Sequence, residues 1–214
     1  MIDIVYEDEY IIVVNKPVGL SSQKDEQQSM VMELELLKSQ TIYPVHRLDK
    51  MVSGLIVYAR DSKTAGKLSK AVANSFFEKD YLAVVENTYE DNKGSLTDLL
   101  FYDRKKNKSF VVNRERNGVK EARLTYMVLD QKDNKALVKV HLLTGRTHQI
   151  RVQFANSGHP LCGDGKYGSK DNHCTVALHS HTLTFKHPVT NRLMYFQSYP
   201  EIKYPWNLFE NNMH

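Results

Sequence analysis

The sequence predicts an α+β protein with an extended, mixed but mostly antiparallel sheet flanked by helices. Segments rich in β-branched and aromatic residues outnumber amphipathic segments. Most of their connections are short enough for antiparallel pairing. The length of 214 residues suits one domain, and 41% hydrophobic with 25% charged residues excludes a disordered chain. We therefore expect a single domain over residues 1–214.

The N-terminal elements are expected to be a hairpin, a helix and a buried strand. Residues 2–6 and 10–14 read as two short strands around an acidic turn. Ser29 can cap a helix whose apolar face would carry Met30, Leu34 and Leu37. Residues 52–59 are rich in β-branched and aromatic side chains, which indicates a buried strand.

The middle of the chain predicts one more helix followed by strands and tight turns. Asp61 or Ser62 can cap a helix with Ala65, Leu68 and Val72 on one face. Residues 81–85 read as a strand. Residues 95–143 alternate strands with polar turns, and Asn117-Gly118 and Asp133-Asn134 are hairpin signals.

The C-terminal part predicts a short helix and a pair of strands. The helix would run from about residue 147 to 157, with Gly158 as its C-terminal stop. Within residues 175–197, two strands are expected around a polar turn at residues 187–191.

Charge is unevenly distributed around the net value of +4. The first 50 residues are more acidic than basic, whereas the stretch 104–123 holds eight Lys and Arg against Glu115 and Glu121. Such a bias fits a polyanion such as nucleic acid, although lysines that only keep a hairpin soluble would give the same pattern.

The sequence shows no pattern typical of a secreted or membrane protein, so a cytoplasmic protein is expected. Cys162 and Cys174 are too few for a secreted disulfide framework, so two free thiols in a reducing compartment are expected. The acidic N-terminus differs from a signal peptide, and no apolar run approaches the roughly 18 residues of a membrane span.

Two segments could carry chemistry. In Pro44–Lys50, Asp49 is flanked by Arg47 and Lys50, which favour the ionised carboxylate that a nucleophile or base requires. In Leu143–Arg151, a helix could pack through Ile150 and Phe154 while directing Arg151 at a cleft. Taken alone, the first segment is more often a salt-linked loop than a site, and the second more often an ordinary surface helix.

Read together, these and other segments resemble the RluA-type family of RNA pseudouridine synthases. The resemblance covers about residues 4–200, with its motifs in family order. They are Val14-Asn15-Lys16-Pro17-x-Gly19, His46-Arg47-Leu48-Asp49 with Ser53-Gly54, Glu78-Lys79-x-Tyr81, Thr144–Arg151, Gly158-His159-Pro160-Leu161-x-Gly163-Asp164-x-x-Tyr167-Gly168, and Leu178-His179-Ser180 with Phe185-x-His187-Pro188.

The resemblance implies a central RNA-binding cleft and conversion of uridine in ribosomal or transfer RNA to pseudouridine, with no cofactor and no metal. Asp49 would be the nucleophile, Tyr81 the residue stacking on the flipped base, and Arg151 the salt-bridge partner of Asp49. Arg47 would enter the RNA stack in place of the flipped nucleotide. Further substrate-binding residues are expected in the same motifs, namely His46, Arg146, His148 and Leu178. A monomer with no obligatory protein partner is expected.

Two departures from the family pattern bear on this interpretation. Val52 stands where the family commonly has threonine, which would change loop hydrogen bonding rather than chemistry. The sequence also starts almost directly on the catalytic motifs, so we expect no N-terminal RNA-binding module. RNA affinity would then depend on the catalytic domain, including the 104–123 stretch.

Two other functions compete. A metal-dependent nucleic-acid hydrolase would use the cluster of potential ligands Cys162, His173, Cys174, His179 and His181, although these lack the paired spacing of a zinc site. An RNA-binding protein without catalysis would be expected to lack the acid, and Asp49 is present.

Overall fold

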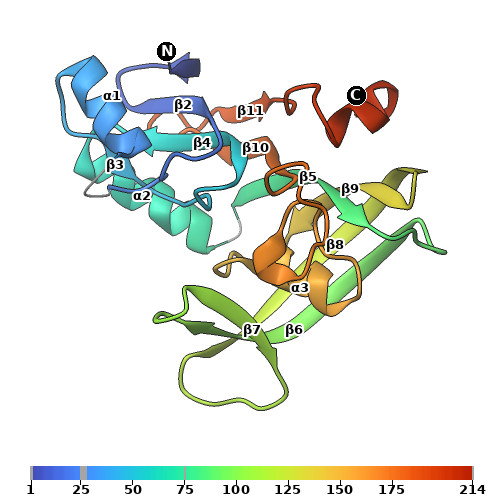
Figure 1. Cartoon of the computed structure of the whole chain (residues 1–214). Coiled ribbons are helices and arrows are strands. Elements are labelled where there is room, and N and C mark those ends of the chain that lie inside the picture. The colour runs from blue at the N-terminus through green and yellow to red at the C-terminus, as the bar shows by residue number, and fades with distance from the viewer. Residues whose placement is uncertain (1, 25–27, 75, 214) are drawn as a thin grey trace. The chain divides into compact units, whose positions relative to one another are not determined.

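The computed structural model describes residues 2–24, 28–74 and 76–213. The chain divides into two compact units. Figure 1 shows its helices and strands, coloured by residue number. Unit 1 combines residues 1–80 with 179–200, and unit 2 combines residues 81–178 with 201–214. The expected single domain over 1–214 stays a prediction.

The strands of unit 1 follow the order β1-β2-β4-β10. Neighbouring strands are antiparallel except for β4 and β10, which run parallel. The short strand β3 pairs with β4, and β11 pairs with β10. The bounds are Asp3–Glu7 for β1, Ile11–Lys16 for β2, Tyr43–Pro44 for β3, Ser53–Ala59 for β4, Leu178–Lys186 for β10 and Leu193–Gln197 for β11.

Two helices of unit 1 begin at the predicted caps. Helix α1 spans Met30–Lys38, and the Ser29 side chain accepts a hydrogen bond from the Met32 backbone N–H. Helix α2 spans Ser62–Ala73 and is capped by Asp61. One expectation fails: Leu37 is 55% exposed instead of lying on the buried face of α1.

The core of unit 1 explains why these segments become strands. All four apolar residues of Ile11–Val14 are fully buried, so β2 is covered on both faces. Alternate residues of β2, β4 and β10 pack together with a residue of α2 in one apolar cluster. The buried members of this cluster include Ile11, Val13, Leu55, Val57, Leu68, Leu183 and Phe185. This core supports the loop that joins β3 to β4.

The strands of unit 2 follow the order β5-β9-β8-β6-β7. Strand β5 begins in unit 1, and the hairpin strands β6 to β9 are antiparallel. At the predicted turn between β8 and β9, Asp133 and Asn134 both have positive φ, as a type I′ hairpin requires. The bounds are Phe77–Glu86 for β5, Lys93–Asp103 for β6, Lys108–Val112 for β7, Val119–Lys132 for β8 and Lys135–Leu142 for β9.

Helix α3 spans Gln149–Asn156 and packs on β6 and β7 (Figure 1). It begins two residues later than predicted because His148 has a left-handed backbone, with φ of 54°, which cannot continue into a helix. Ile150 and Phe154 are buried as expected. Two 3₁₀ segments complete the unit, Gly165–Tyr167 and Trp206–Asn212.

The predicted fold class is confirmed: the structure is α+β with mixed, mostly antiparallel strand pairing. Within the described ranges, no helix is both long enough and apolar enough to span a bilayer.

Candidate active site

Asp49 lies on the loop between β3 and β4 in unit 1. Its side chain is half-buried, the preceding Leu48 is buried, and Arg47 and Lys50 on either side are exposed. The loop closes with a hydrogen bond from the Val52 N–H to the Asp49 carbonyl at 3.0 Å. The Asp49 loop is therefore anchored by the buried Leu48 and has exposed basic residues at positions 47 and 50.

A single hydroxyl holds the residue before Asp49. Ser22 Oγ donates to the Leu48 carbonyl at 2.7 Å and accepts from the Leu48 N–H at 3.0 Å. The Tyr58 hydroxyl donates to the Ser22 carbonyl at 2.8 Å, which ties this clamp to β4. Ser22 is 3% exposed, so water cannot replace these bonds easily.

A fully buried ammonium holds the residue after Asp49. Lys16 Nζ donates to the carbonyls of Pro17, Leu20 and Lys50 at 2.8, 2.9 and 3.4 Å. Burial lowers the pKa of Lys16 to about 8, and the negative charge of Asp49 opposes that shift. A positive charge therefore lies beneath the Asp49 loop.

His46 braces the start of the same loop. Its Nε2 accepts a hydrogen bond from the Val57 N–H of β4 at 3.1 Å, and the ring packs against Phe77. Burial and the nearby charge of Lys79 hold the pKa of His46 well below its usual range, so the ring is neutral. The expected contact of His46 with substrate stays a prediction.

The glycine of the Ser-Gly motif after the loop is required for steric reasons. Gly54 has a φ of +106°, and a Cβ on it would lie 2.3 Å from the Ser180 carbonyl oxygen of β10. Only glycine permits this close parallel pairing of β4 and β10. The buried Val52 keeps its backbone bond to Asp49, so the departure at this position leaves the loop closed.

The other predicted catalytic residues belong to unit 2. Tyr81 is buried on β5, and Leu178 is buried at the first position of β10. Arg151 is 6% exposed on α3. The expected salt bridge from Arg151 to Asp49 joins residues of different units and stays a prediction.

Within unit 2, Arg151 forms a two-pronged ion pair with Asp164. Its Nε and Nη2 donate to the two Asp164 carboxylate oxygens at 2.7 and 2.8 Å. The guanidinium also lies over the Tyr167 ring, 5.1 Å from its centroid. Arg151 is therefore held by a carboxylate and a ring from the turn at residues 164–168.

Tyr167 also connects α3 to β7. Its hydroxyl oxygen accepts from the Ser109 N–H at 2.8 Å, so its hydrogen is available for His148 Nδ1 at 2.8 Å. The Ser109 hydroxyl in turn donates to the Thr147 carbonyl at 2.6 Å. His148 therefore serves the internal packing of unit 2, and its expected contact with substrate stays a prediction.

Arg146 is fixed by backbone and side-chain partners before α3 begins. Its Nε donates to the Glu121 carbonyl at 2.9 Å. The Gln149 side chain accepts from the Arg146 N–H and donates to the Arg123 carbonyl, at 2.9 and 3.0 Å. His148 provides no side-chain cap for α3, and the Gln149 amide orders the residues that precede the helix. Arg146 is half-exposed beside the basic stretch of β8.

Sequence reasoning missed the residues that support the predicted ones. Ser22, Asp164 and Tyr167 have no role in the sequence-based prediction, although Asp164 and Tyr167 stand in one of the family motifs. The spacing of that motif offered a signal, since it brings an acid and an aromatic residue together on one turn.

The potential ligands that a metal-dependent hydrolase would use do not form a metal site among the residues that the structure describes. Among residues 2–24, 28–74 and 76–213, no three His, Cys, Asp or Glu side chains are arranged to hold an ion. His179 bonds Ser53 through Nδ1 and Ser198 through Nε2, at 2.8 and 2.9 Å. Cys162 and Cys174 are free thiols, and burial raises their pKa values to about 12 and about 11.

Comparison with known proteins decides the family. The family model described as RNA pseudouridylate synthase matches residues 10–156, more than half of the chain. The chain belongs to the RNA pseudouridylate synthase family. An uncharacterised RNA pseudouridine synthase of Mycoplasma pneumoniae is 35% identical over 204 residues, covering 92% of this chain and 66% of that protein.

Other members of the RNA pseudouridylate synthase family are similar along most of the chain. A tRNA pseudouridine synthase C of Vibrio parahaemolyticus is 31% identical, over 89% of this chain and 87% of that protein. A ribosomal large subunit pseudouridine synthase C of Haemophilus ducreyi is 28% identical, over 90% of this chain and 63% of that protein. The chain thus spans about two thirds of the length of several relatives.

Solved structures share the fold of this pseudouridylate synthase family member. Human RNA pseudouridylate synthase domain containing 1 matches with a TM-score of 0.82 and 21% identity, covering 96% of this chain and 86% of that chain. Human RNA pseudouridylate synthase domain containing 4 matches with a TM-score of 0.77 and 22% identity, covering 94% and 89%. At this identity the likeness shows the fold alone.

Proposed function

We propose that this chain isomerises uridine in structured RNA to pseudouridine, with Asp49 as the nucleophile. In that reaction the C1′–N1 bond breaks and a C1′–C5 bond forms. N1 gains a proton and C5 loses one, so no atom is added or removed and no redox partner is needed. A carboxylate can support this change only if it is ionised and held against the sugar or the base.

The fixation of the Asp49 loop carries this proposal. Ser22 holds both backbone groups of Leu48, and Lys16 Nζ donates to the Lys50 carbonyl, so both neighbours of Asp49 are anchored. The negative charge of Asp49 raises the pKa of Lys16 against the effect of burial, so the two charges lie close enough to interact. A purely structural loop between two strands has no need of a buried ammonium at its base.

The remaining roles follow from motif position. Tyr81 supplies a π-face for the flipped uracil and a hydroxyl for proton movement. Arg151 pairs with the Asp49 carboxylate, which needs a counter-charge in an enclosed pocket. Arg47, exposed beside Asp49, fills the gap that the flipped nucleotide leaves in the RNA stack.

The hairpin of β6 and β7 supports binding of the RNA backbone. At its turn, the Asp103 carboxylate accepts from the N–H groups of Lys105 and Lys106 at 2.9 and 3.1 Å, which orders a turn carrying two exposed lysines. Lys106 lies 5.7 Å from the Phe110 ring centroid, and Arg116 lies 4.7 Å from that of Phe101. These pairs offer both charge and aromatic surface to RNA.

The RNA substrate is proposed to be ribosomal or transfer RNA, since the names of similar proteins include both. We also propose that the protein acts as a monomer, without an obligatory protein partner, in the cytoplasm. Two free cysteines suit a reducing compartment.

Mapping of pseudouridine tests the proposed activity. Purified protein is incubated with unmodified transcripts of ribosomal RNA and of transfer RNA, and with matched transcripts in which each candidate uridine is replaced by cytidine. New pseudouridine at defined positions of one class supports the proposal and names the substrate. RNA binding without pseudouridine in either class would favour a binding protein, and strand cleavage would favour a hydrolase.

A further inference from the structure

Asp164 lies where it controls the direction of the Arg151 guanidinium. Both side chains are buried, with 1% and 7% of their surfaces exposed, and two parallel N–H···O bonds fix the plane of the guanidinium. Asp164 accepts from Nε and Nη2, which lie on one edge of the guanidinium. Asp164 adds a negative charge beside Arg151, so what it contributes to the role proposed for Arg151 is orientation and not further positive charge.

The backbone around Asp164 is fixed on both sides. Gly163 has a φ of +76°, and a Cβ on it would lie 2.4 Å from the Thr175 carbonyl oxygen, so this position admits only glycine. The Asp164 carbonyl accepts from the N–H groups of Tyr167 and Ser169 at 2.9 and 3.2 Å. The turn that carries Asp164 therefore cannot follow the movements of Arg151.

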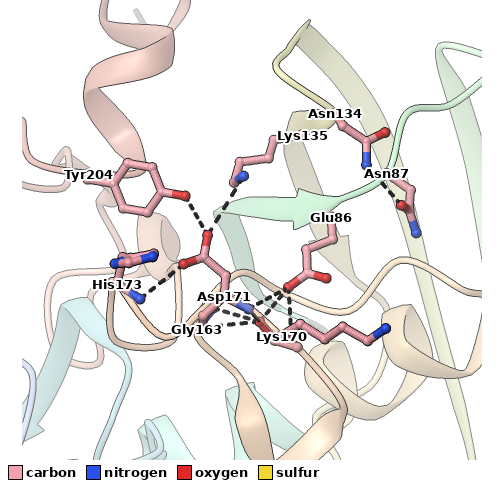
Figure 2. A network of polar contacts seen from close by, with 10 residues as sticks. Glu86, Asn87, Asn134, Lys135, Gly163, Lys170, Asp171, His173 and Tyr204 are labelled. Atoms are coloured by element: carbon pink, nitrogen blue, oxygen red, sulfur yellow. Dashed lines mark hydrogen bonds and ion pairs between the residues drawn. The ribbon is translucent and has the colours of Figure 1, made fainter.

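Polar contacts of residues 169–171, directly after this turn, hold the chain to two strands and to the C-terminal segment (Figure 2). The Glu86 carboxylate of β5 accepts from the Ser169 hydroxyl at 2.5 Å and from the Lys170 N–H at 3.2 Å. The Asp171 carboxylate accepts from the Tyr204 hydroxyl and lies 3.7 Å from Lys135 Nζ of β9. These contacts hold residues 169–171, which follow the turn that carries Asp164.

We propose that Asp164 is a positioning residue for the reaction, which fixes the orientation of the Arg151 guanidinium within unit 2. The proposal rests on the role proposed above for Arg151. An arginine on an eight-residue helix has several rotamers, and a misplacement of about 1 Å can lower a rate about 100-fold. Asp164 and the Tyr167 ring remove that freedom before RNA binds.

A double-mutant cycle in single-turnover rate tests the proposal. At saturating protein, we expect Asp164→Asn to lower the rate by about 10- to 100-fold and leave the Kd for RNA within about twofold. Arg151→Met should lower the rate further, and the double variant should be no slower than Arg151→Met alone, because Asp164 acts only through Arg151. If Asp164→Asn lowered the rate by the same factor in wild-type protein and in the Arg151→Met variant, the proposal would be overturned.

Asp171→Asn is the matched control. Asp171 lies on the same segment as Asp164, and its carboxylate contacts Tyr204 and Lys135. Its variant should therefore lose stability, while its rate stays within about threefold of wild type. An equal loss of rate in the Asp164 and Asp171 variants would show a general loosening of the turn and overturn the proposal.

The same variants distinguish failure of the role proposed for Arg151 from failure of the positioning role of Asp164. If Arg151→Met retains the wild-type rate, the proposed role of Arg151 fails, and the positioning role of Asp164 fails with it. If Arg151→Met is slow but Asp164→Asn is not, only the positioning role fails. Should Asp164→Asn not fold, Asp164→Glu replaces it, since that variant keeps the charge and shifts the carboxylate by one methylene.

Discussion

Ser22 and Leu48, 26 positions apart in the sequence, are joined by two hydrogen bonds through one hydroxyl. Both backbone groups of Leu48 are satisfied by this side chain, in a place where water has little access. The residue that precedes Asp49 is thereby fixed to the N-terminal segment of unit 1. This attachment and the charges around it have measurable consequences.

Ser22→Ala should lower both stability and the rate. The change leaves the buried Leu48 N–H and carbonyl without this partner, which costs about 1–3 kcal/mol of unfolding free energy. Displacement of Asp49 should lower the single-turnover rate by about 10- to 100-fold. Urea unfolding and rapid-quench kinetics measure the two effects.

Ser21→Ala is the control for that change, because the Ser21 hydroxyl bonds locally, to the backbone of Gln23. Its unfolding free energy should stay within about 0.5 kcal/mol of wild type. Equal behaviour of the Ser21 and Ser22 variants would contradict the clamp.

Lys16→Met should change how stability depends on pH. The pKa of Lys16 is about 8 when folded and 10.5 when unfolded, so between these values the unfolded chain binds more protons. Wild-type stability should therefore rise relative to the variant as the pH increases from about 8 to 10.5. Urea titrations of both proteins across this range measure the difference, and parallel curves would show that Lys16 titrates normally.

Charge reversal at the hairpin turn should weaken RNA binding. Lys105→Glu with Lys106→Glu should raise the Kd and reduce the salt slope by up to about 0.7 for each phosphate of single-stranded RNA that is no longer neutralised. The rate at saturating protein should change little. Filter binding across a salt series measures this, with Lys63→Glu and Lys70→Glu on α2 as a charge-matched control. If both double variants changed the Kd and the salt slope equally, the net charge of the protein would explain the effect, and the hairpin would have no special part in RNA binding.

Arg47→Ala should show the opposite pattern. Arg47 is exposed beside Asp49, and its removal should make base flipping less favourable while the hairpin keeps its phosphate contacts. We expect a lower single-turnover rate with a Kd within about threefold of wild type. A variant that binds weakly but reacts at the normal rate once saturated would place Arg47 among the phosphate-binding residues instead.

Local signals made much of the fold predictable. Ser29 and Asp61 mark helix starts because their side chains bond the first free N–H groups, and Asp133-Asn134 marks a hairpin because both residues adopt positive φ. Position His148 shows the limit. Its left-handed backbone makes α3 begin at Gln149, two residues later than the sequence predicts. The His148 side chain contacts the Tyr167 hydroxyl, 19 positions along the chain, and local propensity does not describe such a contact.

The candidate site was predictable only for the residues that carry motif signals. Asp49, Tyr81 and Arg151 stand in sequence patterns, and their roles stay predictions. Their supports depend on tertiary contacts: Ser22 reaches Leu48 across 26 positions, and Asp164 reaches Arg151 across 13. Sequence spacing alone does not reveal which distant side chain completes such a bond.

The central claim is that Asp49 performs the chemistry, and the single-turnover rate of Asp49→Asn tests it most directly. The amide keeps the shape of the side chain but is a poor nucleophile, so pseudouridine formation should fall by at least about 1,000-fold, or about 4 kcal/mol, on RNA that wild type modifies. RNA affinity and the unfolding midpoint should stay close to wild type, as they should for the exposed-turn control Asp133→Asn. A rate within about tenfold of wild type would contradict the account and remove Asp49 from the reaction.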